Sequence, residues 1–337
     1  MRRLPILVLL ATVLLAVYCK PPVQTTPAPA DAPAELVALT GASVLIGTGD
    51  IARCDGNGDE LTARIVDSVL RADSAAKVHD EVFTLGDNAY PDGSARDYRE
   101  CFGRSWGDST RLIMRNIRPT PGNHEHLSNM AAPYYEYFGK AAGSPRKGYY
   151  GYDIGEWRAI ALNSEIVVNS AFTNDERKEQ EDWLKKEIAD NPKKCVLAYW
   201  HHPRFSSGWH GTELRLMPIW QILYEGGVDL ILNGHEHNYE RYLPQDPMGV
   251  VDSAKGMTQI IVGTGGGDLR GFGSSTPGKN SAYQIQGHFG VLKITLGAEE
   301  WQSVFIDTNG RTWDAVGGRC HFPEQAKRDS TATGSTP

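Results

Sequence analysis

The stretch Gly86-Asp87-Asn88-Ala89-Tyr90 directly follows the apolar run Val82 to Leu85. The run predicts a strand, and ligands of α/β sheets bind beyond the carboxyl ends of the strands. Carboxylate, amide and phenol side chains therefore stand where a ligand site is expected, and the glycine allows a sharp turn. This stretch predicts an α/β protein whose chemistry lies at the strand ends.

Four further motifs place a glycine or a proline beside an oxygen or nitrogen donor: Gly49-Asp50, Gly122-Asn123-His124-Glu125, His201-His202-Pro203 and Gly234-His235-Glu236-His237. Each motif is weak alone, because a Gly-Asp after a strand is often only a turn. Together the donors are Asp, Tyr, Asn and His without Cys, a set that suits iron, zinc or manganese. The ordered set predicts a metal site.

Strands alternate with helices along the chain. Strands are expected at 43–48, 82–85, 157–162, 195–200, 228–232, 259–262, 289–296 and 301–306, and helices at 61–70, 176–188 and 216–224. This alternation predicts an α/β architecture.

The order of the motifs resembles that of the calcineurin-like metallophosphoesterases over residues 41–320. Gly-Asp-x-x-Tyr, Gly-Asn-His-Glu, His-x-Pro and Gly-His-x-His resemble the purple acid phosphatase branch in particular. The resemblance implies a single catalytic domain, a four-layer α/β/β/α sandwich, with a dinuclear metal centre at the carboxyl ends of the strands.

The resemblance also implies two sets of metal ligands that share one carboxylate. Asp50, Asp87, Tyr90 and His237 would hold one ion, and Asn123, His201 and His235, with the bridging Asp87, would hold the other. Two carboxylates and a phenolate favour Fe(III), whereas two imidazoles and an amide suit a divalent ion such as Fe, Zn or Mn.

Three histidines beside the ligands are expected to be catalytic. The resemblance makes His124 a phosphate contact or a proton donor and His210 a second substrate histidine. His202 is expected either to contact the substrate or to orient a ligand from outside. The other histidines, His79, His126, His288 and His321, are expected to be structural.

Two positions depart from the family pattern. Many purple acid enzymes read Asp-x-Gly at the first motif, where this chain reads Asp50-Ile51-Ala52. The wider superfamily often has an Asp where Tyr90 stands, and that Asp partners the substrate histidine. With Tyr90 as a metal ligand, His124 needs another partner, which the sequence does not identify.

The expected function is that of an exported metal-dependent phosphoric monoester hydrolase, similar to acid phosphatases, acting on a small phosphoester. A metal-bound hydroxide would attack phosphorus directly while a histidine protonates the leaving oxygen. A phosphodiesterase or nucleotidase on the same dinuclear site is the alternative, because specificity lies in loops such as 131–148 and 268–281. A non-catalytic protein that keeps the fold is a third hypothesis, and the seven filled ligand positions argue against it.

The 337 residues carry a net charge of −7, from 34 basic and 41 acidic residues, without a run of Lys or Arg. A nucleic-acid-binding protein would show a basic stripe, so no nucleic-acid partner is expected. The oligomeric state is left open.

Residues 1–18 are expected to form a signal peptide, since Arg2 and Arg3 precede an apolar run too short to span a bilayer comfortably. A Pro/Ala/Thr-rich tether (19–40), the metallophosphoesterase domain (41–322) and a flexible tail (323–337) follow. Cys19 allows lipidation and a membrane tether, and ordinary cleavage before a Pro-rich linker is the alternative. The protein is expected in the periplasm, on the outer surface or secreted.

Four cysteines lie beyond Cys19, and an even number in an exported chain predicts disulfides. Three pairings are possible. Cys54–Cys101 with Cys195–Cys320 is favoured, because the first two cysteines lie near the first motifs and the second pair would pin the C-terminal end to a core strand.

Overall fold

A computed structural model describes residue 39 and residues 41–193, 195–273 and 276–321. The chain divides into two units, 1–32 and 33–337, and the described residues all belong to the second. The expected signal peptide, the lipidation site Cys19, the tail 323–337 and the tether except Leu39 lie outside the described residues.

Two sheets form the centre of the second unit. The first has the strand order β13 (Thr312–Arg319), β12 (Glu300–Asp307), β11 (Gly290–Leu296), β1 (Ser43–Thr48), β2 (Asp80–Leu85) and β3 (Ile117–Thr120). The second has the order β10 (Ser281–Ile285), β8 (Tyr239–Tyr242), β9 (Thr258–Val262), β7 (Leu230–Asn233), β6 (Cys195–Trp200), β5 (Trp157–Ala161) and β4 (Tyr150–Ile154). Strands β1–β2–β3 are parallel, as are β5–β6–β7–β9, so their carboxyl ends gather at one edge of each sheet.

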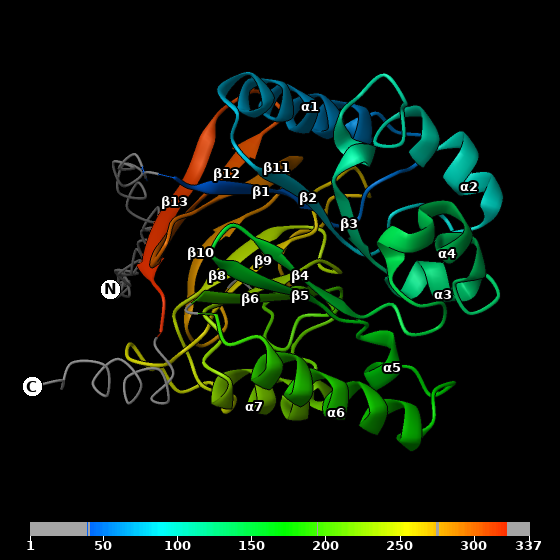
Figure 1. The fold of residues 1–337 in the computed structure, drawn as a ribbon. Coiled ribbons are helices and arrows are strands. Elements are labelled where there is room, and N and C mark those ends of the chain that lie inside the picture. The colour runs from blue at the N-terminus through cyan, green and yellow to red at the C-terminus, as the bar shows by residue number, and fades with distance from the viewer. Residues whose placement is uncertain (1–38, 40, 194, 274–275, 322–337) are drawn as a thin grey trace, which may run out of the picture. The chain divides into compact units, whose positions relative to one another are not determined.

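Helices cover the outer face of each sheet (Figure 1). The helices are α1 (Gly58–Ala76), α2 (Ala95–Glu100), α3 (Asn123–Leu127), α4 (Ala132–Phe138), α5 (Glu165–Val168), α6 (Asn174–Asp190) and α7 (Met217–Glu225). Figure 1 shows α1 across the first sheet, and α6 and α7 beneath the second.

Three buried apolar clusters hold these layers together. Phe83 and Trp157 belong to the cluster between the sheets. Val66 of α1 packs on the outside of the first sheet, and Leu184 of α6 and Trp220 of α7 pack on the outside of the second. Each fully buried large apolar side chain stabilises the fold by roughly 1.5–3 kcal/mol. The predicted four-layer α/β/β/α sandwich is confirmed.

Every element predicted from the sequence is present; the strands at 43–48 and 195–200 have the predicted bounds, and the others are shifted. The helix predicted at 61–70 runs from Gly58 to Ala76, and the strand predicted at 228–232 begins only at Leu230. Val228 is not in that strand because its N–H donates to the carbonyl of Leu223, closing the end of α7. Strand β3, which leads into the third motif, was not predicted, because Arg118 and Pro119 interrupt its apolar pattern.

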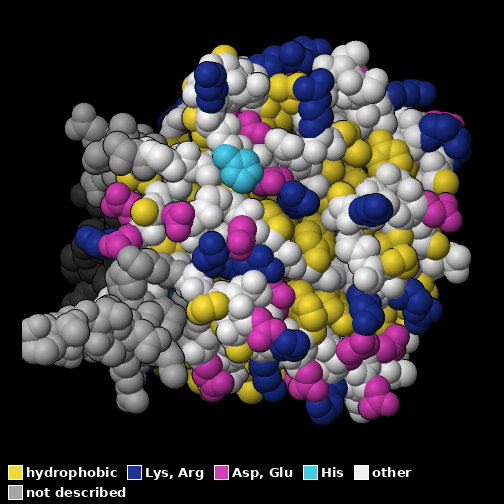
Figure 2. Space-filling model, viewed as in Figure 1, with side chains coloured by type: hydrophobic (Ala, Val, Ile, Leu, Met, Phe, Trp, Pro, Cys, Tyr) yellow, Lys and Arg dark blue, Asp and Glu magenta, His cyan; other side chains and the backbone are white. Residues whose placement is uncertain are grey.

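Charged side chains of both signs are mixed over the face shown in Figure 2. Among the described residues, none of the helices combines the length and the apolar composition that crossing a membrane requires.

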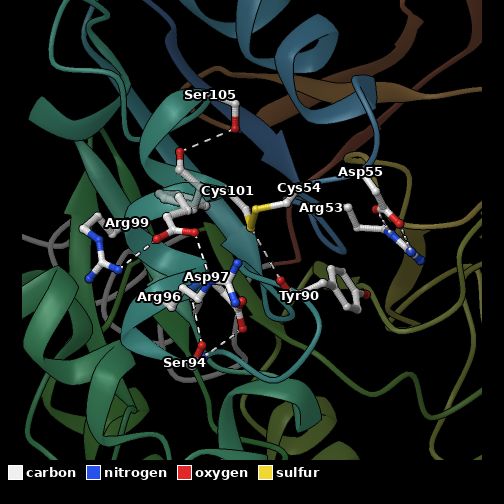
Figure 3. The surroundings of a disulfide bond; sticks show 12 residues. Arg53, Cys54, Asp55, Tyr90, Ser94, Arg96, Asp97, Arg99, Cys101 and Ser105 are labelled. Carbon is white, nitrogen blue, oxygen red and sulfur yellow. Dashed lines mark hydrogen bonds and ion pairs between the residues drawn. A yellow bond between two sulfur atoms is a disulfide. The ribbon is translucent and has the colours of Figure 1, made fainter.

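Both favoured disulfides are present. Cys54–Cys101 joins the loop after β1 to the end of α2, close to Tyr90 (Figure 3), and Cys195–Cys320 joins the start of β6 to the residue after β13. The first disulfide therefore connects the segments that carry the predicted ligands Asp50 and Tyr90.

We expect the two disulfides to differ in reducibility under native conditions. Cys54 is exposed, whereas Cys195 and Cys320 are buried, and an attacking thiolate must reach a sulfur atom. Limited dithiothreitol followed by alkylation and peptide mapping should label Cys54 and Cys101 first, and all four in denaturant. Early labelling of Cys195 would contradict this expectation. Loss of either bridge should cost about 2–5 kcal/mol of stability.

Candidate metal centre

Five of the seven predicted ligands directly follow parallel strands of the two sheets. Asp50, Asp87 and Asn123 come after β1, β2 and β3, and His201 and His235 come after β6 and β7. The carboxyl ends of strands from both sheets thus contribute to one site, as expected for α/β sheets.

Glycines allow the ligand loops to approach one another. A Cβ atom on Gly122 would lie 2.2 Å from Asp87 Oδ1, and one on Gly234 would lie 2.7 Å from Asp50 Oδ2. Asp50, Asp87 and His235 have positive φ angles of 58°, 50° and 69°. Non-glycine residues rarely adopt this conformation, and it is typically concentrated at functional sites.

The first predicted ligand set converges on one point. The Tyr90 hydroxyl oxygen lies 3.0 Å from Asp50 Oδ1, 3.2 Å from Asp87 Oδ2 and 3.1 Å from His237 Nε2. His237 Nε2 lies 3.2 Å from Asp50 Oδ1. Two donors at right angles around one ion, each about 2.1 Å from it, are about 3.0 Å apart. The four donors thus have the spacing of a single coordination shell.

The second set converges around the His201 ring. His201 Nε2 lies 3.0 Å from Asn123 Oδ1, 3.1 Å from His235 Nδ1 and 3.4 Å from Asp87 Oδ2. Asp87 Oδ2 is therefore a neighbour of both sets, which is the position a bridging carboxylate needs. The donor chemistry and spacing fit two cations.

Backbone groups orient the ligand side chains. His201 Nδ1 lies 2.6 Å from the carbonyl of Leu85, and His237 Nδ1 lies 2.5 Å from that of Asp268. A carbonyl only accepts hydrogen bonds, so each Nδ1 carries a proton and each Nε2 is left for the metal. The N–H of His235 donates to Asp50 Oδ2 at 2.8 Å, which leaves Asp50 Oδ1 facing the site.

Burial and mutual charge perturb the ionisable groups of the site. Burial opposes charge on His201, but the carboxylates of Asp87 and Asp50, with the carbonyl of Leu85, together outweigh burial and raise the pKa of His201 to about 10. Burial, with the charges of Asp50 and Asp87, raises the pKa of Tyr90 well above its usual value. A cation among these donors acts in the opposite direction, because metal ligands bind deprotonated.

His124 has a partner that the sequence did not identify. Its Nδ1 lies 2.5 Å from the carbonyl oxygen of Pro91, and its Nε2 lies 3.8 Å from Asp87 Oδ2. Because the carbonyl can only accept, Nδ1 keeps its proton and Nε2 is the nitrogen that exchanges one. The His124 side chain is 30% exposed, so it remains accessible.

The other two candidate catalytic histidines lie in different positions. The His210 ring is 40% exposed and packs 4.1 Å, centre to centre, from the ring of His235. His202 is buried, with Nδ1 2.9 Å from Ser164 Oγ and Nε2 3.6 Å from Glu165 Oε1. Its ring lies 4.2 Å from that of His235. This geometry favours the orienting role among the two predicted for His202.

The four histidines expected to be structural have contacts outside the ligand sets. His126 Nδ1 lies 3.0 Å from the carbonyl of Gly122. His79, His288 and His321 lie within ion-pair distance of Glu81, Asp307 and Asp229 respectively.

Sequence reasoning missed two buried glutamates inside its own motifs. Glu125 accepts hydrogen bonds from the N–H groups of Asp87, Asn88 and Gly122 at 2.9, 2.8 and 2.7 Å. Burial and the charge of Asp87 raise the pKa of Glu125 to about 7. Its place three residues after Gly122 was the available signal, since an acidic residue there can accept bonds from a helix N-terminus.

Glu236, between the ligands His235 and His237, fixes the loop that carries His210. Its Oε1 accepts the N–H groups of His210 and Gly211 at 2.9 and 3.1 Å, and its Oε2 lies 3.3 Å from His210 Nδ1. His210 therefore keeps a proton on Nδ1 and directs Nε2 elsewhere.

Removal of the His124 ring should lower turnover without emptying the site. His124→Ala should reduce kcat by about 10²–10⁴-fold, the usual contribution of positioned proton transfer. Metal analysis should find the same number of metal ions per chain as in the parent. His126→Ala, which alters a buried ring on the same helix, is the matched control and should retain most of the turnover of folded protein. Loss of metal from His124→Ala would instead make the residue a ligand or a structural group.

The fold and the two donor sets are those expected of a metallophosphoesterase, and comparison with known proteins shows the family. The family model described as calcineurin-like phosphoesterase matches residues 44–239. The chain belongs to the calcineurin-like phosphoesterase family.

Within this family the chain is similar to purple acid phosphatases. It is 29% identical over 168 residues to purple acid phosphatase 15 of Arabidopsis thaliana, covering 43% of this chain and 28% of that protein. It is 28% identical over 201 residues to mouse tartrate-resistant acid phosphatase type 5, and the match covers 52% of this chain and 61% of the mouse protein. The matched regions thus span less than two thirds of either relative.

A solved structure extends the likeness of fold over most of the chain. Purple acid phosphatase PPD1 from yellow lupin (Lupinus luteus) seeds matches with a TM-score of 0.68 at 19% sequence identity. The match covers 88% of this chain and 56% of that chain. Most of this chain therefore shares its fold with about half of the lupin protein.

Proposed function

We propose that the chain is an exported phosphoric monoester hydrolase that depends on two metal ions. The observation that carries the proposal is the pair of donor sets sharing Asp87 Oδ2, each with the spacing of a coordination shell. The partly exposed ring of His124 and the exposed ring of His210 lie beside these sets. Purple acid phosphatases among the relatives support the same activity.

The proposed division of roles follows from the contacts. Asp50, Asp87, Tyr90 and His237 would hold one ion, and Asn123, His201, His235 and Asp87 would hold the other. When bound, two such ions supply a water nucleophile of lowered pKa and neutralise charge on the phosphoryl oxygens.

The histidines supply the rest of the chemistry. His124, held through Nδ1 by Pro91, exchanges a proton at Nε2 and donates it to the leaving oxygen of the ester. His210, oriented by Glu236, contacts the phosphoryl group. His202 packs against the ring of His235 and holds that ring in its orientation.

Export is proposed because two disulfides persist only in an oxidising compartment in most organisms. A small phosphoester is the proposed substrate.

The experiment that tests the function combines metal analysis with a panel of phosphoesters on the same sample. Protein purified from an oxidising compartment should contain two metal ions per chain and hydrolyse monoesters such as 4-nitrophenyl phosphate faster than diesters such as bis(4-nitrophenyl) phosphate. A preference for diesters would favour the phosphodiesterase alternative. Metal-loaded protein inactive on every ester would contradict the proposal.

For the first site we propose Fe(III), because Asp50, Asp87 and Tyr90 offer three anionic oxygen donors. A phenolate bound to Fe(III) gives a visible charge-transfer band that Zn(II) or Mn(II) does not give. Iron-loaded parent protein should be coloured, and Tyr90→Phe should lose the band. Tyr98→Phe, which removes a buried phenol outside the donor sets, should keep it. A colourless iron-loaded parent would contradict the assignment of Tyr90 as a ligand.

A further inference from the structure

Arg270 lies in the loop after β9, and its backbone is tied to the metal-ligand loops. Its N–H donates to the carbonyl of His237 at 2.9 Å, and the N–H of Gly267 in the same loop donates to the carbonyl of Asp50 at 2.8 Å. His237 Nδ1 returns a hydrogen bond to the carbonyl of Asp268. Arg270 is therefore fixed against the proposed metal centre, although no motif predicted from the sequence includes it.

The guanidinium of Arg270 is exposed and faces His210. Its Nη1 lies 3.3 Å from His210 Nε2, and no carboxylate among the described residues lies within ion-pair distance of it. Arg53 provides the contrast on the neighbouring loop, because both oxygens of Asp55 and one of Asp268 bind its guanidinium. Of these two cations beside the site, the charge of Arg53 is compensated and that of Arg270 is not.

An uncompensated guanidinium is a strong anion-binding group. Its planar fork matches phosphate and carboxylate oxygens, and hydrogen bonds between charged partners are stronger than a bond to a neutral ring nitrogen. An anion should therefore displace His210 from Arg270. Glu236 holds the opposite nitrogen of the His210 ring, so the ring would stay in place with Nε2 released toward the substrate.

We propose that Arg270 binds a second anionic group of the substrate, so that the enzyme prefers phosphate esters and anhydrides whose leaving group carries a carboxylate or is itself a phosphate. The proposal rests on the proposed function, because it places the ester phosphate between the two donor sets. It assigns Arg270 to substrate specificity and leaves the reaction itself to the ligands and to His124.

The test compares Arg270→Gln with the parent on glycerol 2-phosphate, glycerate 2-phosphate and pyrophosphate. The ratio of kcat/KM between parent and variant is taken for each substrate, so that intrinsic reactivity cancels. Loss of a charged hydrogen-bond partner typically lowers kcat/KM by a factor of about 10–100. The parent-to-variant ratio for glycerate 2-phosphate and for pyrophosphate should therefore exceed the ratio for glycerol 2-phosphate by that factor. The glycerate and pyrophosphate arms distinguish carboxylate from phosphate recognition.

Arg53→Gln is the matched control, because it removes a guanidinium that is already paired with carboxylates. For this variant the parent-to-variant ratio of kcat/KM should be the same for all three substrates. Arg270→Lys should recover part of the discrimination. Equal ratios for all three substrates in Arg270→Gln would overturn the proposal and leave Arg270 only a positioning residue for His210.

A binding measurement separates this proposal from the proposed function. Calorimetry on the metal-loaded full chain gives the affinities for pyrophosphate and inorganic phosphate without requiring turnover. Arg270→Gln should weaken pyrophosphate binding at least tenfold more than phosphate binding. Parent protein that hydrolyses no ester but shows this difference would contradict the hydrolase and support the anion subsite, whereas an unchanged affinity ratio would overturn the subsite.

Discussion

Asp87→Asn should lose metal from both halves of the site, and with it nearly all phosphoester hydrolysis. Asp87 Oδ2 is within 3.4 Å of donors from both sets, Tyr90 and His201, and the amide removes the negative charge that the sets share. The change should also leave His201 without one of the two carboxylates that raise its pKa. Metal analysis of dialysed protein, with activity on 4-nitrophenyl phosphate, measures both losses.

Asp73→Asn is the matched control for Asp87→Asn. Asp73 is also a buried carboxylate, but it lies near the end of α1, where the chain leads into the start of β2 rather than to the ligand edge. The folded fraction of Asp73→Asn should bind two metal ions per chain and should have a turnover close to that of the parent. Two metals and near-normal turnover in Asp87→Asn itself would contradict the bridging role.

That the candidate ligands would gather at one edge of the sheets could be predicted because each signal was local. A glycine and a donor at the end of an apolar run mark a sheet edge, and β1, β2, β6 and β7 were recognisable as apolar runs. Parallel strands then bring their carboxyl ends together without further information. The third motif was recognised although β3 was not, because Gly122 and Asn123 carry their own signal.

The partners of these residues could not be predicted, because they depend on contacts between distant segments. The carbonyl of Pro91 holds His124 across 33 residues, and Arg270 meets His210 across 60. Nothing in the residue types near Pro91 distinguishes its carbonyl from any other. Glu236 was quoted within a motif, but its contacts with Ser206, His210 and Gly211 appear only when the two loops pack.

The site is thus held by two buried carboxylates that bind no metal in the proposed scheme. Glu236 fixes the loop of His210, and Glu125 fixes the loop of Asp87. Glu125 accepts more hydrogen bonds than Glu236. Its oxygens accept the backbone N–H groups of Asp87, Asn88, Ala89 and Gly122, and the hydroxyl of Tyr98 at 3.1 Å. It joins the loops after β2 and β3 at the point where Asp87 adopts a positive φ.

Glu125→Ala should therefore both destabilise the fold and empty the metal site. Four buried backbone donors, including the N–H of Ala89 at 3.3 Å, would lose their acceptor, at about 1–3 kcal/mol each where water does not replace it. A loss of about 3 kcal/mol or more is a large part of the stability of an ordinary domain. Denaturant unfolding of metal-free protein measures this loss without the contribution of bound ions, and metal analysis of the folded fraction measures the second effect.

Two further variants separate the carboxylate's hydrogen bonds from its bulk. Glu125→Gln keeps the shape but turns an NH₂ group toward backbone N–H donors whichever way the amide is oriented, because both oxygens of Glu125 accept such bonds. It should therefore lose both stability and metal, though less than Glu125→Ala. Tyr98→Phe removes only one hydroxyl donor and leaves the backbone bonds intact, so it should cost about 1 kcal/mol and keep both metals. If Glu125→Gln matched the parent in stability and metal content, the acceptor role of Glu125 would be wrong, and the positive φ of Asp87 would have to be maintained by its other contacts.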